Sequence, residues 1–229
     1  MNYFIFNGID SKSFKSLIVN ELDTIVRPAE KLERFDIPLY NGQMINETGF
    51  YETTIRNVEC TLKDLSELDE ILKWLRGSGH VVFSNQPDRY YMTTIVNNIL
   101  FSRVIKQLRK FTIQFECQPF GYLTEGKDTI RFENSDTLVN PGTVESEPII
   151  KIIGSGDMSI TIGDCTFEIT NVDQYITVDV PLMEVYKDNR LMNKLYVGDF
   201  PMLKVGENNI SWLGTDIKAV EIIPNWRCL

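Results

Sequence analysis

Short segments rich in β-branched and aromatic residues recur along the whole chain. Gly, Asn, Asp and Pro, which favour turns, separate one such segment from the next. The number and spacing of these segments predict a mainly β protein. We expect the clearest strands of the first half at Tyr3–Phe6, Ser16–Val26, Thr53–Leu62, Val81–Ser84, Tyr90–Asn97 and Phe111–Cys117.

The second half contains the most specific local signal, a β-hairpin. Met158–Ile162 and Cys165–Ile169 alternate apolar and polar residues and flank Gly163 and Asp164. A glycine at the first position of a two-residue loop suits a type II′ turn. This turn fixes the register, and it pairs Ile162 with Cys165, Ile160 with Phe167, and Met158 with Ile169. With the strands expected at Tyr175–Val180, Met183–Lys187, Asn209–Leu213 and Lys218–Ile223, it predicts a small antiparallel sandwich.

One segment, Lys63–Arg76, has the periodicity of a helix. Its apolar residues recur at three- and four-residue steps, which places them on one helical face that must pack on a sheet. They are Leu65, Leu68, Ile71, Leu72 and Leu75. Thr61 or Asp64 can cap the start of the helix, and Gly77 can end it. We therefore expect a β-sandwich or barrel in the first half that carries one covering helix.

A polar stretch with three prolines and three glycines separates the two strand-rich regions. Such composition is typical of a linker between domains. The 229 residues are enough for two small domains. We predict a first domain over residues 1–125, a linker over residues 126–147 with one strand at Thr129–Glu133, and a second domain over residues 148–229.

Charge and cysteine spacing exclude several classes of protein. Lys and Arg total 23 and Asp and Glu total 32, so the net charge is −9 and nucleic-acid binding over the whole surface is not expected. The one basic run, Arg103–Lys110, suits a solvated edge strand. The four cysteines form no metal or redox motif, and no leader or membrane span is expected. We expect free thiols in a reducing cytosol.

No catalytic constellation emerges from the sequence. His80 is the single histidine, which excludes a multi-histidine metal site, and no nucleophile elbow or phosphate loop occurs. We expect no catalytic residue, cofactor or metal, although an oxygen-only calcium site stays open because carboxylates are abundant. A glycosidase remains the weakest alternative, because a carboxylate pair has no spacing signature. A carbohydrate- or cell-wall-binding module is the main alternative, with Trp212 and Trp226 as a partner or glycan face, although core packing is favoured for both rings.

Several short motifs follow one another in a fixed order. They are YFIFNGIDSKSF at the N-terminus, VRPAEKLERFDIPLYNG, the Trp74-Leu75 pair of the helix, Ser84…Pro87…Tyr90-Tyr91, PFGY, NPGTVESEP, GSGDMSITIGDCTFEI and the terminal EIIPNWRCL. Together they resemble the distal tail protein family of long-tailed, non-contractile bacteriophages, over essentially the whole chain. Leu39-Tyr40-Asn41-Gly42 departs from the Gly-Arg-x-Gly turn of many members, and the second domain has no room for the carbohydrate-binding insertion that some members carry.

The resemblance implies a non-enzymatic virion protein of a phage or prophage. Such proteins form a homo-hexameric ring at the distal end of the tail tube, with a tail-tube-like first domain around a channel for transient DNA passage. A galectin-like or carbohydrate-module-like second domain faces outward. Expected partners are the tail tube protein, the tail-associated tip protein and receptor-binding or baseplate proteins, without membrane insertion. The location would be the virion tail tip, after assembly in the bacterial cytoplasm.

The resemblance also implies ring contacts near Arg27, Arg34 and Asn41. An acidic chain suits a channel for DNA, because like charge repels phosphate and does not trap it. A further β-rich alternative is a tube subunit, which would polymerise into long tubes.

Overall fold

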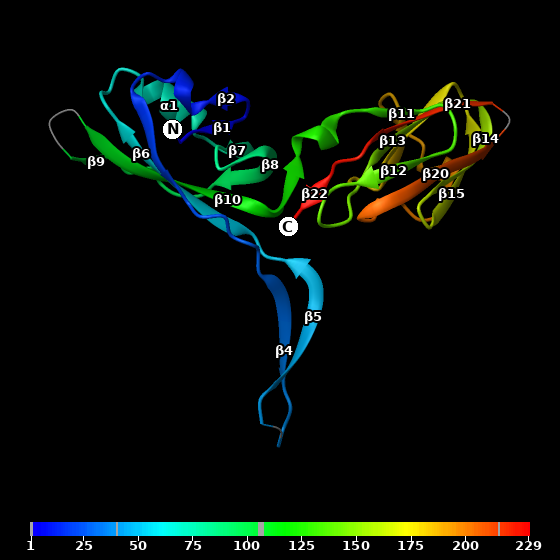
Figure 1. Cartoon of the computed structure of the whole chain (residues 1–229), viewed down its shortest axis with the longest axis horizontal. Helices are drawn as coiled ribbons and strands as arrows, with labels where there is room; N and C mark the ends of the chain where they lie inside the picture. The colour runs from blue at the N-terminus through cyan, green and yellow to red at the C-terminus, as the bar shows by residue number, and fades with distance from the viewer. Residues whose placement is uncertain (1, 40, 105–107, 215) are drawn as a thin grey trace. The chain divides into compact units, whose positions relative to one another are not determined.

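The computed structural model describes residues 2–39, 41–104, 108–214 and 216–229, and it forms two compact units. One unit comprises Met1–Gly121 and Leu229, and the other comprises Tyr122–Cys228. Both units consist mainly of antiparallel strands, with one α-helix in the described part of the first unit. The prediction of a mainly β protein with one covering helix is confirmed (Figure 1).

The first unit is built around one large sheet. The sheet order is β2-β1-β7-β8-β10-β6-β3, and the short strand β9 also pairs with β10. The strands are β1 (Phe4–Phe6), β2 (Ile9–Asp10), β3 (Leu17–Leu22), β6 (Thr54–Leu62), β7 (Ser78–Phe83), β8 (Gln86–Ile95), β9 (Ser102–Arg103) and β10 (Arg109–Leu123). A short 3-10 helix, η1 (Ser11–Ser13), follows β2. Two further strands, β4 (Glu30–Asp36) and β5 (Gln43–Tyr51), form a separate two-stranded sheet.

Alternate residues of the long strand β10 enter the core of the first unit. Phe111, Ile113, Phe115 and Cys117 are buried, while the residues between them are partly exposed. This period of two is expected where one face of a sheet is covered. The basic run predicted as an edge strand is described only in part, because residues 105–107 lie outside the described residues; Arg103 of β9 pairs with Arg109 of β10.

The helix α1 (Leu68–Trp74) is shorter than the predicted Lys63–Arg76. The side chains that were expected to begin the helix bind other groups. Asp64 accepts a hydrogen bond from the amide of Ser66 at 2.9 Å, which forms a turn before the helix. Glu67 accepts one from the amide of Ser16 at 2.8 Å, which ties the start of the helix to the segment before β3.

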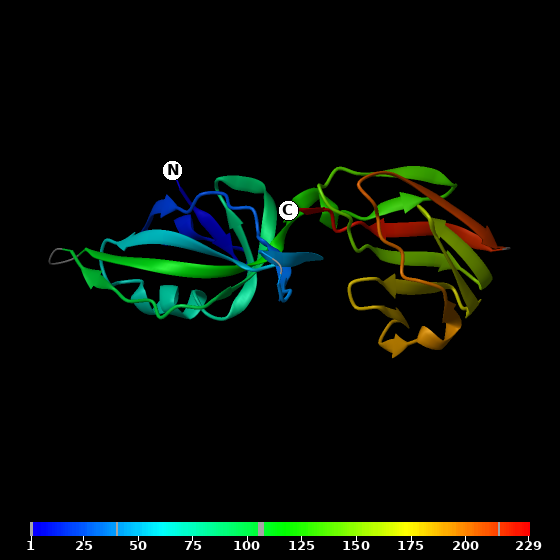
Figure 2. The ribbon, with the colours of Figure 1, turned by 90° about the horizontal axis from the view of Figure 1, so that it is seen from below.

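The buried face of α1 also differs from the predicted stripe. Ile71, Trp74 and Leu75 are buried, whereas Leu65 and Leu72 are exposed. In Figure 2 the helix lies along one side of the sheet of the first unit. Gly77 follows the helix with a φ of +79°, a left-handed conformation that glycine adopts without strain, as predicted.

Trp74 connects α1 to the first strand. Its ring stacks on Phe4 with 5.2 Å between the ring centroids. Its indole N–H donates to the carbonyl oxygen of Phe6 at 3.0 Å. The tryptophan therefore buries a large apolar ring and satisfies its only polar atom, which is the arrangement that a buried tryptophan needs.

The second unit is a sandwich of two antiparallel sheets. Their orders are β11-β21-β13-β16-β17-β18 and β12-β20-β14-β15-β19. The strands are β11 (Ile130–Phe132), β12 (Asp136–Asn140), β13 (Ile149–Gly154), β14 (Gly156–Ile162), β15 (Cys165–Val172), β16 (Tyr175–Asp179), β17 (Glu184–Lys187), β18 (Arg190–Leu191), β19 (Tyr196–Val197), β20 (Gly206–Gly214) and β21 (Ile217–Ile223). The remaining elements are η2 (Thr124–Lys127), η3 (Asn193–Leu195) and the terminal strand β22 (Arg227–Cys228).

The β14–β15 hairpin has the predicted register. Ile162 pairs with Cys165, Ile160 with Phe167, and Met158 with Ile169. Gly163 has a φ of +57° and Asp164 has no positive φ, which fits a type II′ turn. The inward side chains of this hairpin are buried in the sandwich core, except that of Cys165, which is half-buried.

The segment expected to be a linker contributes two strands to the sandwich. Within residues 126–147, β11 pairs with β21 and β12 pairs with β20. Each is the outermost strand of its sheet, so most of its side chains meet solvent and only a few, such as Phe132 and Leu138, are buried. Edge strands of this composition are as polar as a linker, which explains why the sequence predicted a linker where the structure has β11 and β12.

The four cysteines are free thiols. Burial raises the pKa of Cys60 to about 12. No helix within the described ranges is both long enough and apolar enough to cross a membrane.

Replacing Trp74 by Phe tests its place in the first unit. The variant loses the bond to Phe6 and leaves that carbonyl without its indole donor. We expect the free energy of unfolding to fall by about 1–3 kcal/mol, measured by urea denaturation followed by circular dichroism. Trp212→Phe, at a half-buried position of the other unit, should cost less. An equal or larger loss of stability in the Trp212 variant would contradict the structural role given to Trp74.

Candidate functional site: the β4–β5 hairpin and its attachment

Within the described structure, no residue of β4 or β5 belongs to the hydrophobic core of the first unit. Figure 1 shows the β4–β5 hairpin as a ribbon of two strands with no third strand beside it. Phe35 lies opposite Met44, and Arg34 lies opposite Ile45. Because neighbouring residues of a strand point to opposite faces, these two pairs lie on opposite faces of the ribbon.

Apolar side chains are exposed on both faces of the hairpin. The exposed fractions are 51% for Phe35, 59% for Met44, 55% for Ile45 and 70% for Phe50. An isolated two-stranded hairpin is at best marginally stable in water. Large exposed apolar residues gathered on one element mark a surface that contacts another molecule. The hairpin therefore has the properties of a protein interface.

Asp23 holds the chain that enters the hairpin. Its backbone N–H donates to the carbonyl oxygen of Asn57 at 3.0 Å. One oxygen of its carboxylate accepts from both the backbone and the side-chain nitrogen of Asn57, at 3.1 and 3.0 Å. The side chain of Asn85 donates to the carbonyl of Asp23 at 3.2 Å. These bonds fix the entry of the hairpin to β6 and to the β7–β8 turn.

The chain that leaves the hairpin is fixed by a second set of contacts. The backbone N–H of Glu52 donates to Ala29 at 2.8 Å, which closes the base of the ribbon. The hydroxyl of Thr53 donates to the carboxylate of Glu116 at 2.9 Å. The ring of Tyr51 meets that of Phe120 edge-on, with 6.0 Å between the centroids. Both ends of the hairpin are thus attached to strands of the large sheet.

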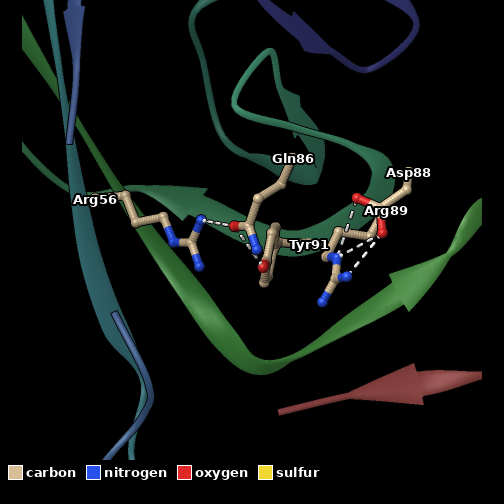
Figure 3. A network of polar contacts seen from close by, with 5 residues as sticks. All are labelled: Arg56, Gln86, Asp88, Arg89 and Tyr91. Atoms are coloured by element: carbon tan, nitrogen blue, oxygen red, sulfur yellow. Dashed lines mark hydrogen bonds and ion pairs between the residues drawn. The ribbon is translucent and has the colours of Figure 1, made fainter. Parts of the chain in front are cut away.

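Arg56, five residues after the hairpin, is the centre of a buried polar network (Figure 3). Only 5% of its surface is exposed. Its Nη1 donates to Oε1 of Gln86 at 2.8 Å, and the hydroxyl of Tyr91 donates to the same oxygen at 2.9 Å. The guanidinium carbon lies 4.1 Å from the centroid of the Tyr91 ring and 5.4 Å from that of Phe83.

This arrangement keeps a charged guanidinium buried without a direct carboxylate partner among the described residues. An amide oxygen and two aromatic faces replace a carboxylate, since the electron-rich face of a ring attracts a cation. The Nε atom of Arg56 has no hydrogen-bond partner within the described structure. A buried charge with so few acceptors depends strongly on each of them.

The same charge contributes to the electrostatics of Asp23. The pKa of the Asp23 carboxyl lies below its ordinary value, mainly because the backbone amide of Asn57 donates to it. The Asn57 side chain, the amide of Thr24 and the positive charge of Arg56 lower the pKa further, while partial burial opposes them. The carboxylate at the entry of the hairpin is therefore held in its ionised form.

An ion pair lies next to this network. Arg89 and Asp88 are 2.7 Å apart, and Figure 3 shows them beside Tyr91. Gly121 of the PFGY motif packs here, because a Cβ atom at this position would lie 2.9 Å from Arg89 and 3.0 Å from Tyr91. The motif thus places a glycine where β10 approaches the Arg56 network closely.

The hairpin carries two of the three residues predicted at the ring contact. Arg34 lies in β4, Asn41 lies between β4 and β5, and Arg27 precedes β4. All three are exposed. The sequence did not predict β4 and β5, nor the exposed apolar residues of the ribbon. Apolar and polar residues alternate only imperfectly in Glu30–Asp36. The density of apolar residues around Tyr40 was the one sequence signal that could have indicated the ribbon.

The two tryptophans predicted as a partner or glycan face have different surroundings. Trp226 is 4% exposed and belongs to the core of the second unit. Trp212 is half-buried and packs against the same core. His80 lies exposed in β7, and its backbone N–H donates to the side chain of Asn7 at 3.0 Å. Over the described ranges, no group of three His, Cys, Asp or Glu side chains could hold a metal ion.

The Arg56 network predicts an asymmetry between two substitutions. Gln86→Leu leaves the buried guanidinium without its acceptor and should lower the free energy of unfolding by roughly 2–4 kcal/mol. In an Arg56→Met background the same change should cost about 1 kcal/mol or less, because no buried charge remains. Urea denaturation of the four proteins in this cycle measures the difference. Equal costs in both backgrounds would show that Gln86 does not satisfy Arg56.

The Asp23 carboxylate predicts a pH-dependent contribution to stability. Because its pKa is lower in the folded protein, its contribution is complete above the pKa of the unfolded chain, about 4. It is lost as the pH falls through the lower folded value. Asp23→Ala should therefore cost roughly 1–2 kcal/mol at neutral pH and less in acid. Denaturation at several pH values tests this, with Asp128→Ala, which removes an exposed carboxylate, as the control. A cost independent of pH would contradict it.

The sequence matches no protein-family model and no curated protein. Among solved structures, the chain is similar to the crystal structure of the Dit protein of phage SPP1, described as a paradigm of the hub adsorption apparatus in phages that infect Gram-positive bacteria. The TM-score is 0.75 at 14% sequence identity, and the match covers 97% of this chain and 98% of that chain. Over nearly its whole length, the chain therefore has the fold of the SPP1 Dit hub protein.

Proposed function

We propose that the protein is a structural component of a phage or prophage tail, a ring-forming hub at the distal end of the tail tube. The observation that carries this proposal is the match in fold to the SPP1 Dit hub protein, which extends through both units. The order of the sequence motifs supports it independently, because those motifs are spread from the N-terminus to the terminal EIIPNWRCL. The proposed role is mechanical and requires no catalysis.

The exposed hairpin supports assembly into a closed ring. A ring of identical subunits needs two different complementary patches on each copy. We propose that the hairpin is one patch and lies against a neighbouring subunit, which would cover residues such as Phe35, Met44 and Phe50. Arg27, Arg34 and Asn41 would then contribute polar contacts around them. Six copies are proposed, in line with the resemblance to distal tail proteins.

The proposed ring joins other parts of the tail. Its partners would be the tail tube protein on one side and the tail-associated tip protein on the other, with receptor-binding or baseplate proteins held by the second unit. DNA would pass through the channel, where the acidic balance of the chain, −9, would limit trapping of phosphate. The protein would be assembled in the bacterial cytoplasm and would reside at the virion tail tip.

The oligomeric state of the purified chain tests the ring. Size-exclusion chromatography with light scattering gives the mass, and negative-stain imaging gives the symmetry. We expect closed six-fold rings, single or stacked in pairs. Long tubes would identify a tube subunit instead. A monomer at all concentrations, both alone and with the tail tube protein, would contradict the ring.

A hairpin variant should separate assembly from folding. Met44→Lys places a charge among exposed apolar residues, so it should abolish rings. The stability of the monomer should change by no more than about 0.5 kcal/mol, as is usual at exposed positions. Val139→Lys changes a residue of the second unit that is 55% exposed and serves as the matched control. Rings that persist in the Met44 variant and in Phe35→Lys would exclude the hairpin as the contact.

A further inference from the structure

A cavity of about 560 Å³ lies in the second unit, apart from the hairpin and the Arg56 network. The loop between β15 and β16, the turn between β17 and β18, and the chain around η3 surround it. Its volume is within the range of about 300–1,000 Å³ that is typical of small-molecule sites. Neither Trp212 nor Trp226 lines it.

The cavity has an apolar floor and a polar rim. Val172 and Ile176 are buried core residues, and Met192 and Leu195 pack against the same core, so these four form the floor. The rim contains both donors and acceptors: Asn171, Asp173, Lys187, Asp188, Asn189 and Arg190. A small apolar surface surrounded by amides, carboxylates and cations suits a ligand with one C–H face and many hydroxyl groups.

Hydrogen bonds hold the rim in place before any ligand arrives. Lys187 Nζ lies 2.9 Å from Oδ2 of Asp173. The hydroxyl of Tyr175 donates to Asp188. The backbone N–H of Asn171 donates to the carboxylate of Asp157 at 2.9 Å. A rim with such contacts loses little conformational freedom when a ligand binds, which favours affinity.

Tight turns define the backbone of the rim. Gln174, with a φ of +65°, lies in the loop between β15 and β16, and Asp188, with a φ of +53°, lies in the turn between β17 and β18. Short loops of this kind require such left-handed conformations.

The charges of the rim are not all balanced internally. Asp173 is paired with Lys187, and Asp188 accepts the Tyr175 hydroxyl. Arg190 lies exposed in the edge strand β18, and within the described residues no carboxylate forms an ion pair with it. Arginine can bind a carboxylate or a phosphate through two parallel hydrogen bonds. One cation at the rim is therefore available to an anionic ligand.

We propose that this cavity binds a saccharide that carries an anionic group. The C–H face of the sugar covers the floor of Val172, Ile176, Met192 and Leu195. Asn171 and Asn189 bind its hydroxyl groups, and Arg190 binds the carboxylate or phosphate. This site is independent of the ring, so its failure would leave the proposed tail role intact, and loss of the ring would leave the site intact.

Calorimetry or NMR titration of the full-length protein tests this site. The probes are glucuronate and glucose 6-phosphate, with glucose and acetate as the matched controls for the anion and for the sugar. We expect at least one anionic sugar to bind with a Kd on the order of 1 mM, and glucose and acetate to bind at least about tenfold more weakly. Binding of glucuronate alone would identify a carboxylate as the anion, and binding of glucose 6-phosphate alone would identify a phosphate.

Two variants locate the ligand. Arg190→Gln should weaken binding of the anionic sugar about tenfold, a loss typical of one charge-assisted contact. Met192→Trp fills the floor and should weaken it at least as much, with folding checked by circular dichroism. Lys204→Gln is the control and should not change binding. Lys204 pairs with Asp164, just before the start of β15, whereas the cavity lies at the end of that strand.

Three results would overturn the proposal. Glucose binding as tightly as the anionic sugars would remove the role of Arg190. Acetate binding as tightly as the sugars would reduce the cavity to an anion site. If none of the probes binds at concentrations well above ~1 mM, the cavity does not bind such a saccharide.

Discussion

A ribbon of two strands cannot bury its own side chains. It has two faces and no third layer, so every apolar residue on it stays in contact with water until another molecule covers it. The β4–β5 hairpin carries such residues on both faces, with Phe35 and Met44 on one and Ile45 on the other. We infer that the hairpin is stabilised by a contact with another molecule. This constraint connects the fold of the first unit to its proposed role.

An interface element is effective only if its position is defined. Asp23 and Asn57 fix the chain that enters the hairpin, and the buried guanidinium of Arg56 lies directly after the chain that leaves it. Burying a charge is costly, and the Gln86 oxygen together with the Tyr91 ring offsets part of that cost in the observed geometry. The network thereby favours one arrangement of β6 and β8 at the base of the hairpin. We infer that the buried charge of Arg56 is retained, despite its energetic cost, because the network positions the hairpin.

The sequence predicted those elements whose determinants are local. The β14–β15 hairpin follows from alternation and from Gly163, so its register was predicted residue by residue. The start of α1 was predicted too early, because Glu67 binds Ser16, which lies 51 positions away. The strands β11 and β12 have the polarity of a linker, since each borders its sheet. Such contacts arise from tertiary structure and leave no periodic pattern.

The candidate site was predictable only in part for the same reason. The resemblance indicated Arg27, Arg34 and Asn41, and two of these belong to the hairpin, but no pattern indicated the ribbon itself. Arg56 looks in the sequence like any polar residue of a strand. Its burial follows from Gln86, which is 30 positions away, and from the ring of Tyr91. A single sequence carries no signal for a cation that is held by a neutral amide.

The two units expose different kinds of surface, and this difference bears on their functions. Permanent interfaces between subunits are more apolar than transient ones. The hairpin of the first unit exposes large apolar side chains on both faces, among charged and amide side chains, so it suits a contact that forms once during assembly. The cavity of the second unit has a polar rim around a small apolar floor, which suits a ligand that binds and leaves. We therefore infer assembly through the first unit and ligand recognition through the second.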